Sequence, residues 1–195
     1  MPYPAKTSAG AIQAAAIDLL EREGDAALTL RRLARVLELA PNALYRHFPS
    51  REVLVAAIAD EVARRLLAAI RQVLADSGPK ARTSRRAAAD RVRVLVEVYT
   101  AFAHEHPALY QTLMTDMAEA EAALPKPLGH DLLWDQVIAV IAPLTGLKKA
   151  PAAAVALWGL LHGLWELRRA NLLGGKKPAD VVGFGVDALI KGLTS

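Results

Sequence analysis

The chain has 195 residues, 53% of them hydrophobic and 23% charged, which indicates a globular protein and excludes a disordered one. Its 24 lysines and arginines exceed its 20 acidic residues, and the net charge of +4 permits a polyanionic partner without requiring one. Cysteine is absent, which excludes disulfides, thiolate metal sites and a cysteine nucleophile. Abundant alanine and leucine, with only 5% aromatic residues, favour helices over sheets.

The N-terminal residues 1–11 lack the apolar segment and cleavage site of a secretory signal. The most apolar segment, residues 150–165, is shorter than the ~20 residues of a membrane span and contains His162. We therefore expect a cytoplasmic protein in which this segment is a buried helix.

Helical spacing of apolar residues recurs along the chain, so the sequence predicts an all-α protein of about nine helices. Gly24 ends the first helix, Thr29 and Ser50 are expected N-caps, and Pro41 is expected at the first position of the third helix. The predicted helices cover residues 8–22, 30–37, 41–48, 51–74, 84–105, 107–117, 130–144, 151–172 and 178–193. Three short helices followed by longer ones predict a small module over residues 1–55 and a larger helical domain over residues 56–195.

Residues 30–48 have the pattern of a helix-turn-helix, in which the second helix can lie in the major groove of DNA. Ala34 provides the small side chain for the helix crossing, and Leu39 is an apolar anchor in the turn. Leu44 and Phe48 lie four residues apart and form the inner face of the second helix. Its outer face would carry Asn42, Tyr45, Arg46 and His47.

Basic residues are concentrated in the same region. Residues 29–51 contain five arginines against Glu38 alone, an excess equal to the net charge of +4 of the whole chain. Such a cluster can neutralise phosphates and provide affinity for DNA without specificity. A solvated charged surface is the alternative interpretation of the cluster alone, and the helix-turn-helix pattern favours DNA binding.

Three segments of residues 12–67 resemble the DNA-binding module of the TetR family of bacterial regulators: Ile12 to Gly24, Thr29 to Ala34, and Ala43 to Glu52. The last segment, Ala-Leu-Tyr-Arg-His-Phe-Pro-Ser-Arg-Glu, is the most specific. The resemblance implies that Thr29, Tyr45, His47 and Arg51 contact the DNA backbone and that Pro41, Asn42 and Ala43 face base edges. The full set of DNA-binding residues expected from charge and resemblance is Thr29, Arg31, Arg32, Pro41, Asn42, Ala43, Tyr45, Arg46, His47 and Arg51. For Asn42, an ordinary residue at a helix start is the alternative.

Two positions depart from the family pattern. Glu38 stands where the turn usually has glycine, and a left-handed conformation there would cost ~1–2 kcal/mol. Ala40 stands where a serine or threonine cap is usual, which loses on the order of 1 kcal/mol.

The larger domain is expected to form a homodimer, because one recognition helix covers too few base pairs for useful specificity. Small and apolar residues in the last two predicted helices are the candidates for the interface: Gly159, Gly163, Val181, Phe184, Gly185 and Ala188. The alternative is that these residues only build the core of one protomer.

Trp158, His162 and Gly163, with the His-Pro-Ala-Leu-Tyr segment at 106–110, resemble the TetR-like C-terminal domain named for its Trp, His and Gly. An effector pocket of aromatic residues and flexible methionines would take an apolar or aromatic ligand. The candidate lining residues are Tyr99, Phe102, Met114, Met117, Trp134, Trp158 and His162. Ordinary core positions are the alternative for each of them.

No nucleophile–base pattern, phosphate-binding loop or converging metal ligands stand out, so we expect no enzyme activity, no cofactor, no metal and no membrane partner. The sequence predicts a ligand-responsive repressor that binds double-stranded DNA as a homodimer and is released by a small-molecule effector. The alternative is an all-helical small-molecule binding protein whose DNA-binding module is degenerate.

Overall fold

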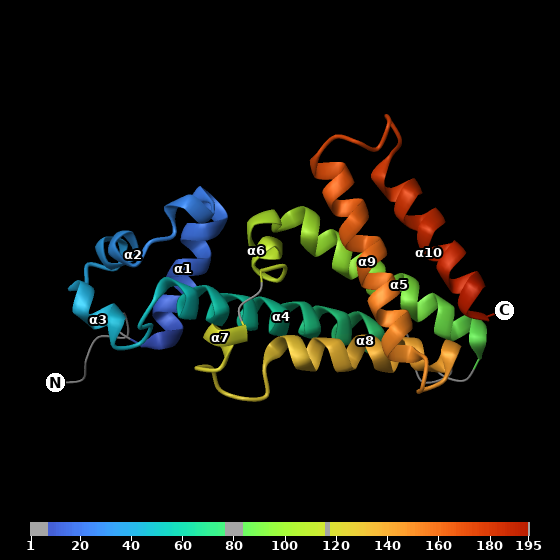
Figure 1. Cartoon of the computed structure of the whole chain (residues 1–195), viewed down its shortest axis with the longest axis horizontal. Coiled ribbons are helices and arrows are strands. Elements are labelled where there is room, and N and C mark those ends of the chain that lie inside the picture. Colours follow the sequence, from blue (N-terminus) through green and yellow to red (C-terminus); the bar gives the residue numbers. More distant parts are fainter. Residues whose placement is uncertain (1–7, 77–83, 116–117, 195) are drawn as a thin grey trace. The chain divides into compact units, whose positions relative to one another are not determined.

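The computed structural model describes residues 8–76, 84–115 and 118–194 (Figure 1). Within these residues the protein has ten α-helices, one short 3₁₀ helix and no strand, which confirms the all-α prediction. The helices are α1 (Ala9–Glu23), η2 (Asp25–Ala27), α2 (Leu30–Val36), α3 (Pro41–Tyr45), α4 (Arg51–Asp76), α5 (Arg85–Glu105), α6 (Pro107–Thr112), α7 (Ala118–Glu121), α8 (Gly129–Thr145), α9 (Ala150–Arg169) and α10 (Pro178–Thr194).

The described residues form two compact units. The first contains the chain up to Ala68 together with Ala101–Leu133, and the second contains Ala69–Thr100 and the chain from Trp134 onward. The division between the units falls within α4, α5 and α8. The expected boundary between residues 55 and 56 is a division by function and stays a prediction.

The first unit has one hydrophobic core that the helix-turn-helix shares with its neighbours. Ile12 and Leu20 of α1, Leu33 of α2 and Leu44 of α3 are almost completely buried in it. Leu109 of α6, from far along the sequence, lies in the same core. The helix-turn-helix is therefore held by the burial of apolar surface that α6 also covers.

Polar contacts hold α6 and the start of α8 in this unit. His106, at the start of α6, lies 2.5 Å from Glu21 of α1. The Asp60 carboxylate accepts from the backbone N–H of Gly129, and Arg64 donates to the Pro127 carbonyl at 2.6 Å. A Cβ at Gly129 would overlap the Asp60 carbonyl oxygen, so only glycine permits this close approach of α8 to α4.

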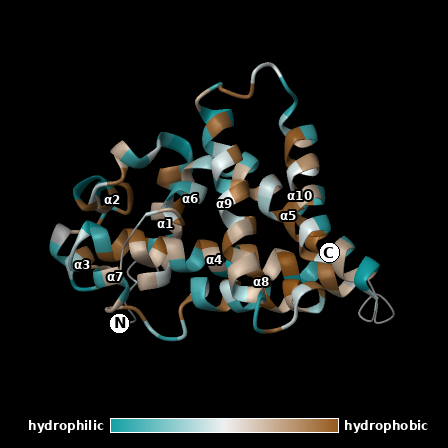
Figure 2. Cartoon of the chain, turned by 45° about the vertical axis from the view of Figure 1, so that its right-hand side comes forward, coloured by the Kyte–Doolittle hydropathy of each residue, from teal (hydrophilic) through white to brown (hydrophobic). Residues whose placement is uncertain are grey.

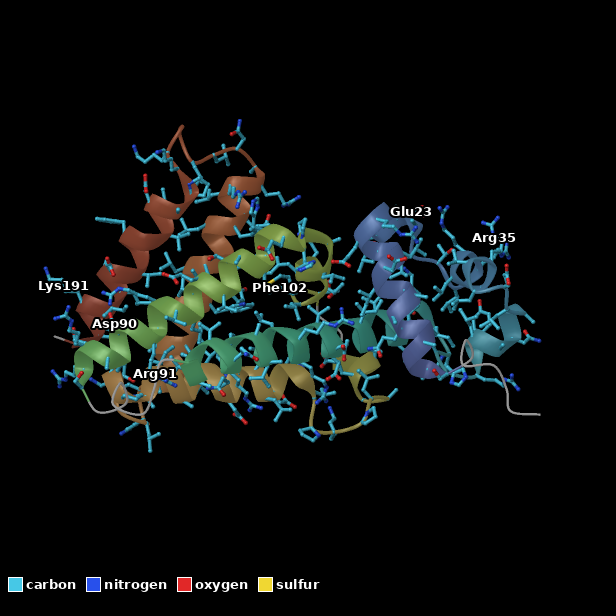
Figure 3. All side chains as sticks on the ribbon, turned by 180° about the vertical axis from the view of Figure 1, so that it is seen from behind. Glu23, Arg35, Asp90, Arg91, Phe102 and Lys191 are labelled. Atoms are coloured by element: carbon cyan, nitrogen blue, oxygen red, sulfur yellow. The ribbon has the colours of Figure 1, made fainter. Side chains whose placement is uncertain are left out.

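In the second unit, α9 and α10 lie side by side (Figure 1). Leu157 and Leu161 of α9 and Val186 and Ile190 of α10 are buried. Figure 3 labels Asp90 and Arg91 on α5 and Lys191 on α10. Nearby, Arg93 of α5 donates to Asp90 and to Asp187 of α10, both at 2.9 Å, and so connects the two helices.

Several predicted helix bounds were wrong. The helix that begins at Pro107 ends at Thr112 and not at Met117, and residues 116–117 lie outside the described residues. The Thr112 hydroxyl donates to the Leu109 carbonyl at 2.7 Å, one of several local bonds that compete with helix continuation. The α9 helix ends at Arg169 and not at Leu172. Neither η2 nor α7 was predicted, because they are single turns without a repeating apolar pattern.

Among the described residues, no single helix is both long enough and apolar enough to cross a membrane; α8 and α9 pass this test only as a pair, which is bent by 112°.

Candidate nucleic-acid interface

The N-terminus of α2 is built as the sequence predicts. The Thr29 hydroxyl accepts from the backbone N–H of Arg32 at 3.2 Å, so Thr29 is the N-cap. Leu33 and Ala34 are buried, and Ala34 lets the two helices of the motif approach closely. Thr29 itself is exposed and can still donate its hydroxyl hydrogen to an acceptor outside the protein.

The turn between α2 and α3 closes as a Schellman motif. The N–H of Glu38 donates to the Arg35 carbonyl at 3.1 Å, and the N–H of Leu39 donates to the Ala34 carbonyl at 2.8 Å. This pairing places Glu38 in the left-handed region, with φ of 56°. Glu38 therefore adopts the conformation that glycine usually supplies, and the turn keeps its geometry at a cost in strain.

The second helix of the motif, α3, has only five residues and begins at Pro41. Ala40 is its N-cap and provides no side-chain hydrogen bond, as its methyl group predicts. Leu44 and Phe48 are buried in the core and fix the orientation of α3.

The outer face of α3 presents polar groups to solvent. Asn42, Arg46 and His47 are exposed, and the Tyr45 ring is 50% exposed although it is large and apolar in part. Ala43 is half-buried, and the side chain of Pro41 lies outside the described residues. The structure thus brings these predicted residues together on one short exposed helix and its C-terminal turn.

The five arginines of the basic cluster divide into two groups. Within the described part of the chain, Arg31, Arg35 and Arg46 are exposed and have no acidic partner. Figure 3 labels Arg35 on α2 and Glu23 at the end of α1. The other two arginines bind groups of the protein itself: Arg32 pairs with Glu23, and Arg51 pairs with Asp25.

Sequence reasoning missed the two acids of these pairs. Glu23 and Asp25 lie just before the basic segment, and no local spacing rule connects them to arginines 9 and 26 residues further along the chain. Their role follows only from the path of the chain around α1, η2 and α2.

The predicted effector residues belong to both compact units. Phe102 and Met114 are in the first unit, where Phe102 packs against the helix-turn-helix core and lies 5.1 Å from the His106 ring. Tyr99 and Trp134 are half-buried in the second unit. In α9, the rings of Trp158 and His162 stack at 5.9 Å with an interplanar angle of 16°. Met117 lies outside the described residues.

The outer faces of α9 and α10 carry apolar groups, and Figure 2 shows hydrophobic residues along both helices. Phe184 is 79% exposed and Trp158 is 42% exposed, and a Cβ added at Gly159 or Gly163 would meet no atom of another element within 4 Å. Val181 is half-buried and Ala188 is exposed. Gly185 is different, because a Cβ there would lie 3.2 Å from the Leu160 side chain of α9 in the same protomer. Gly185 therefore contributes to the packing of α10 on α9 within the protomer, and its expected place in the dimer interface stays a prediction.

A capped first helix, a tight turn and a short second helix with an exposed polar and basic face define a helix-turn-helix DNA-binding protein. The TetR family model for bacterial regulatory proteins matches residues 12–58, and a tetracyclin repressor-like C-terminal domain model matches residues 92–189. The chain belongs to the TetR family of transcriptional regulators. The more specific resemblance to the Trp-His-Gly type is not confirmed by these models.

A curated relative agrees with this assignment. The chain is 32% identical over 180 residues to the uncharacterised HTH-type transcriptional regulator Rv0681 of Mycobacterium tuberculosis, covering 87% of this chain and 74% of that protein.

Two solved structures have the same fold. A protein of unknown function from Rhodococcus sp. RHA1 matches with a TM-score of 0.73 and 23% identity, covering 100% of both chains. The structure of BioQ with its double-stranded DNA operator matches with a TM-score of 0.58 and 23% identity, covering 96% of this chain and 98% of that chain.

Proposed function

We propose that this regulator is a repressor that binds an inverted-repeat operator as a homodimer and is released by a small apolar or aromatic effector. The observation that carries the DNA part of this proposal is the short helix α3, which is anchored by buried Leu44 and Phe48 and exposes polar groups on its other side. BioQ, a structural relative, is described in a complex with its operator, which supports the same mode of binding here.

The contacts divide by chemistry. Asn42 can make a bidentate pair with adenine, and Ala43 and Pro41 can contact a thymine methyl group in the major groove. Thr29, Tyr45 and His47 are exposed and can bind phosphate oxygens, contacts that fix the position of the protein without reading sequence. Arg31 and Arg46 are exposed without an acidic partner in the described chain and can neutralise phosphates.

The exposed apolar face of α9 and α10 supports a second copy of this chain as its partner. This face contains the exposed aromatic ring of Phe184 and two glycines, Gly159 and Gly163, at which another helix could approach closely. Aromatic residues are enriched in interface cores. A two-fold dimer contains two α3 helices, one for each half-site of an inverted repeat. We include Gly159, Gly163, Val181, Phe184 and Ala188 in this interface.

The effector proposal depends on the second unit, which contains all three tryptophans of the chain. Tyr99, Trp134, Trp158 and His162 provide aromatic surface with a few polar groups, namely one phenolic hydroxyl, two indole N–H groups and one imidazole. Such a surface suits an apolar or aromatic ligand. Such a ligand can act only if its affinity differs between the DNA-binding state and the released state.

The test of operator binding is selection of bound fragments from the genomic DNA of the source organism at near-physiological salt, followed by sequencing. We expect enrichment of an inverted repeat whose half-sites lie about one helical turn apart. Binding that depends only on salt and not on sequence would instead support the alternative, a ligand-binding protein with a degenerate DNA-binding module.

The test of effector binding uses tryptophan fluorescence, because all three tryptophans lie in the second unit and its signal reports on that unit alone. A library of small aromatic compounds is screened for quenching, and each hit is tested for release of the protein from the enriched repeat. A Trp158→Phe variant should keep the fold and lose most of the quenching. Quenching without any change in DNA binding would contradict the effector role.

A further inference from the structure

We propose that Arg51 is a positioning residue that holds the chain just before α2 against the start of α4, and that it does not neutralise a DNA phosphate. This inference rests on the proposed DNA-binding function and changes the role that the family resemblance implies for Arg51. In this role, Arg51 helps to set the orientation of the helix-turn-helix within the first unit.

The guanidinium of Arg51 has three acceptors on the connection between α1 and α2. Its Nε donates to the Leu28 carbonyl at 2.9 Å. Its Nη2 donates to the Asp25 carbonyl oxygen at 3.4 Å and to the Asp25 carboxylate. Because Nε and Nη2 both belong to one planar guanidinium, contacts to two donors at once restrain both the position and the plane of the side chain.

The Leu28 carbonyl needs such a donor. The first backbone hydrogen bond of α2 joins the Leu33 N–H to the Thr29 carbonyl at 2.9 Å, so the helix leaves the preceding Leu28 carbonyl unsatisfied. The Leu28 residue is completely buried, and a buried carbonyl without a donor is costly. Arg51 supplies the donor one residue before the Thr29 cap, where the direction of α2 is set.

Arg51 itself lies at a helix start that is capped and anchored in the core. Arg51 is the first residue of α4, and the Ser50 hydroxyl accepts from the Val53 N–H at 3.3 Å at the same helix start. Leu54, in the first turn of α4, is completely buried in the core. The Arg51 side chain therefore connects the anchored start of α4 to the residues just before α2.

A change of charge at Asp25 distinguishes this positioning role from phosphate binding. The Arg51 guanidinium already pairs with the Asp25 carboxylate, and its Nε and Nη2 are bound to the connection between α1 and α2. A phosphate would therefore have to bind through Nη1 alone or displace these acceptors. If Arg51 positions α2, loss of Asp25 weakens operator binding. If Arg51 binds phosphate and Asp25 competes for it, loss of Asp25 strengthens operator binding, because a competing negative charge has been removed. The two roles predict opposite signs for one substitution.

The experiment measures affinity of the full-length protein for the enriched inverted repeat, and for a random duplex of equal length, over a series of salt concentrations. The variants are Arg51→Gln, Asp25→Asn and, as a phosphate-contact comparison, Arg46→Gln. Asp18→Asn is the matched charge control, because Asp18 is also an exposed acid of the first unit but pairs with Arg22 at 2.7 Å and not with Arg51.

We expect Arg51→Gln and Asp25→Asn each to lower affinity for the repeat by roughly threefold to tenfold, between the value of an exposed ion pair and that of a charge-assisted hydrogen bond. The salt slope of Arg51→Gln should equal that of wild type, whereas Arg46→Gln should lower it by about 0.9 per protomer. Asp18→Asn should leave affinity unchanged or raise it slightly.

A lower salt slope for Arg51→Gln, or tighter binding by Asp25→Asn, would overturn the positioning role. Failure of the proposed function is a separate result: wild type would then show no preference for any repeat. In that case the slopes on the random duplex still decide between the two roles of Arg51, and a wild type that binds no duplex overturns both proposals.

Discussion

Glu38 holds the left-handed position of the Schellman turn that joins α2 to α3. Glu38 makes a further interaction besides these backbone hydrogen bonds. The backbone strain is therefore isolated by comparing two variants that both lack the glutamate side chain. We expect Glu38→Gly to be more stable than Glu38→Ala by about 1 kcal/mol, since only glycine adopts positive φ without steric cost. Urea unfolding of both variants measures the difference, and equal stabilities would show that the turn relaxes to another conformation.

Glu52 provides a pH-dependent contribution at the start of α4. A hydrogen bond from the Ser50 hydroxyl holds the pKa of the Glu52 carboxyl below its ordinary value, with a further contribution from its own backbone N–H. A carboxyl whose pKa is lowered by folding stabilises the protein above its unfolded pKa, and this contribution is lost as the pH falls through the folded pKa.

Wild type should therefore be more stable than Glu52→Gln at neutral pH, and the difference should vanish in acid. The measurement is thermal unfolding of both proteins from neutral to acidic pH. In a Ser50→Ala background the difference at neutral pH should shrink, because the largest cause of the lowered pKa is removed. A difference that grows on acidification would contradict this assignment.

Among the elements, α6 has a role that its place in the sequence does not suggest. Leu109 is 2% exposed and lies in the core of the helix-turn-helix. Leu109→Ala should lower the free energy of unfolding by about 2–5 kcal/mol, the usual cost of a large cavity in a core. Urea unfolding should show the lower free energy of unfolding, and a DNA-binding assay should show weaker binding.

The matched control for this prediction is Leu172→Ala, which removes the same atoms from a side chain that is 67% exposed. It should change stability by less than about 0.5 kcal/mol, as surface substitutions usually do. If Leu109→Ala were as mild as this control, α6 would not be part of the DNA-binding core.

Local signals predicted the cap and boundary residues of the first four α-helices. Thr29, Ser50, Pro41 and Gly24 have the expected cap and boundary roles, because each acts through backbone atoms within a few residues. The inner face of α3 also follows from spacing, since Leu44 and Phe48 are four residues apart. These features depend only on short stretches of chain.

Features that depend on the path of the chain were not predictable from spacing. The pairing of Arg51 with Asp25, the placement of Leu109 beside α1 and the contact of Gly185 with Leu160 all join residues that are distant in sequence. Composition marks these residues only as basic, apolar or small. Their partners are decided by tertiary packing, which local propensity does not encode.

At the scale of the whole molecule, the proposed dimer depends on the outer face of α9 and α10. Phe184→Glu should make the protein monomeric and weaken binding to the inverted repeat, because a charge cannot be buried at the centre of an apolar interface without large cost. Sedimentation analysis gives the oligomeric state. Leu147→Glu, at a side chain that is 82% exposed on the connection between α8 and α9, should stay dimeric.

The central claim is that α3 reads DNA sequence while the residues around it bind the backbone. The most direct test compares the affinity of wild type, Asn42→Ala and Tyr45→Phe for the enriched repeat and for a random duplex. Asn42→Ala should lose about 1–3 kcal/mol per half-site on the repeat and nothing on the random duplex, because it removes a base contact. Tyr45→Phe should weaken both by similar factors, because it removes a phosphate contact. If Asn42→Ala weakened both duplexes equally, or neither, α3 would not be the element that reads the operator.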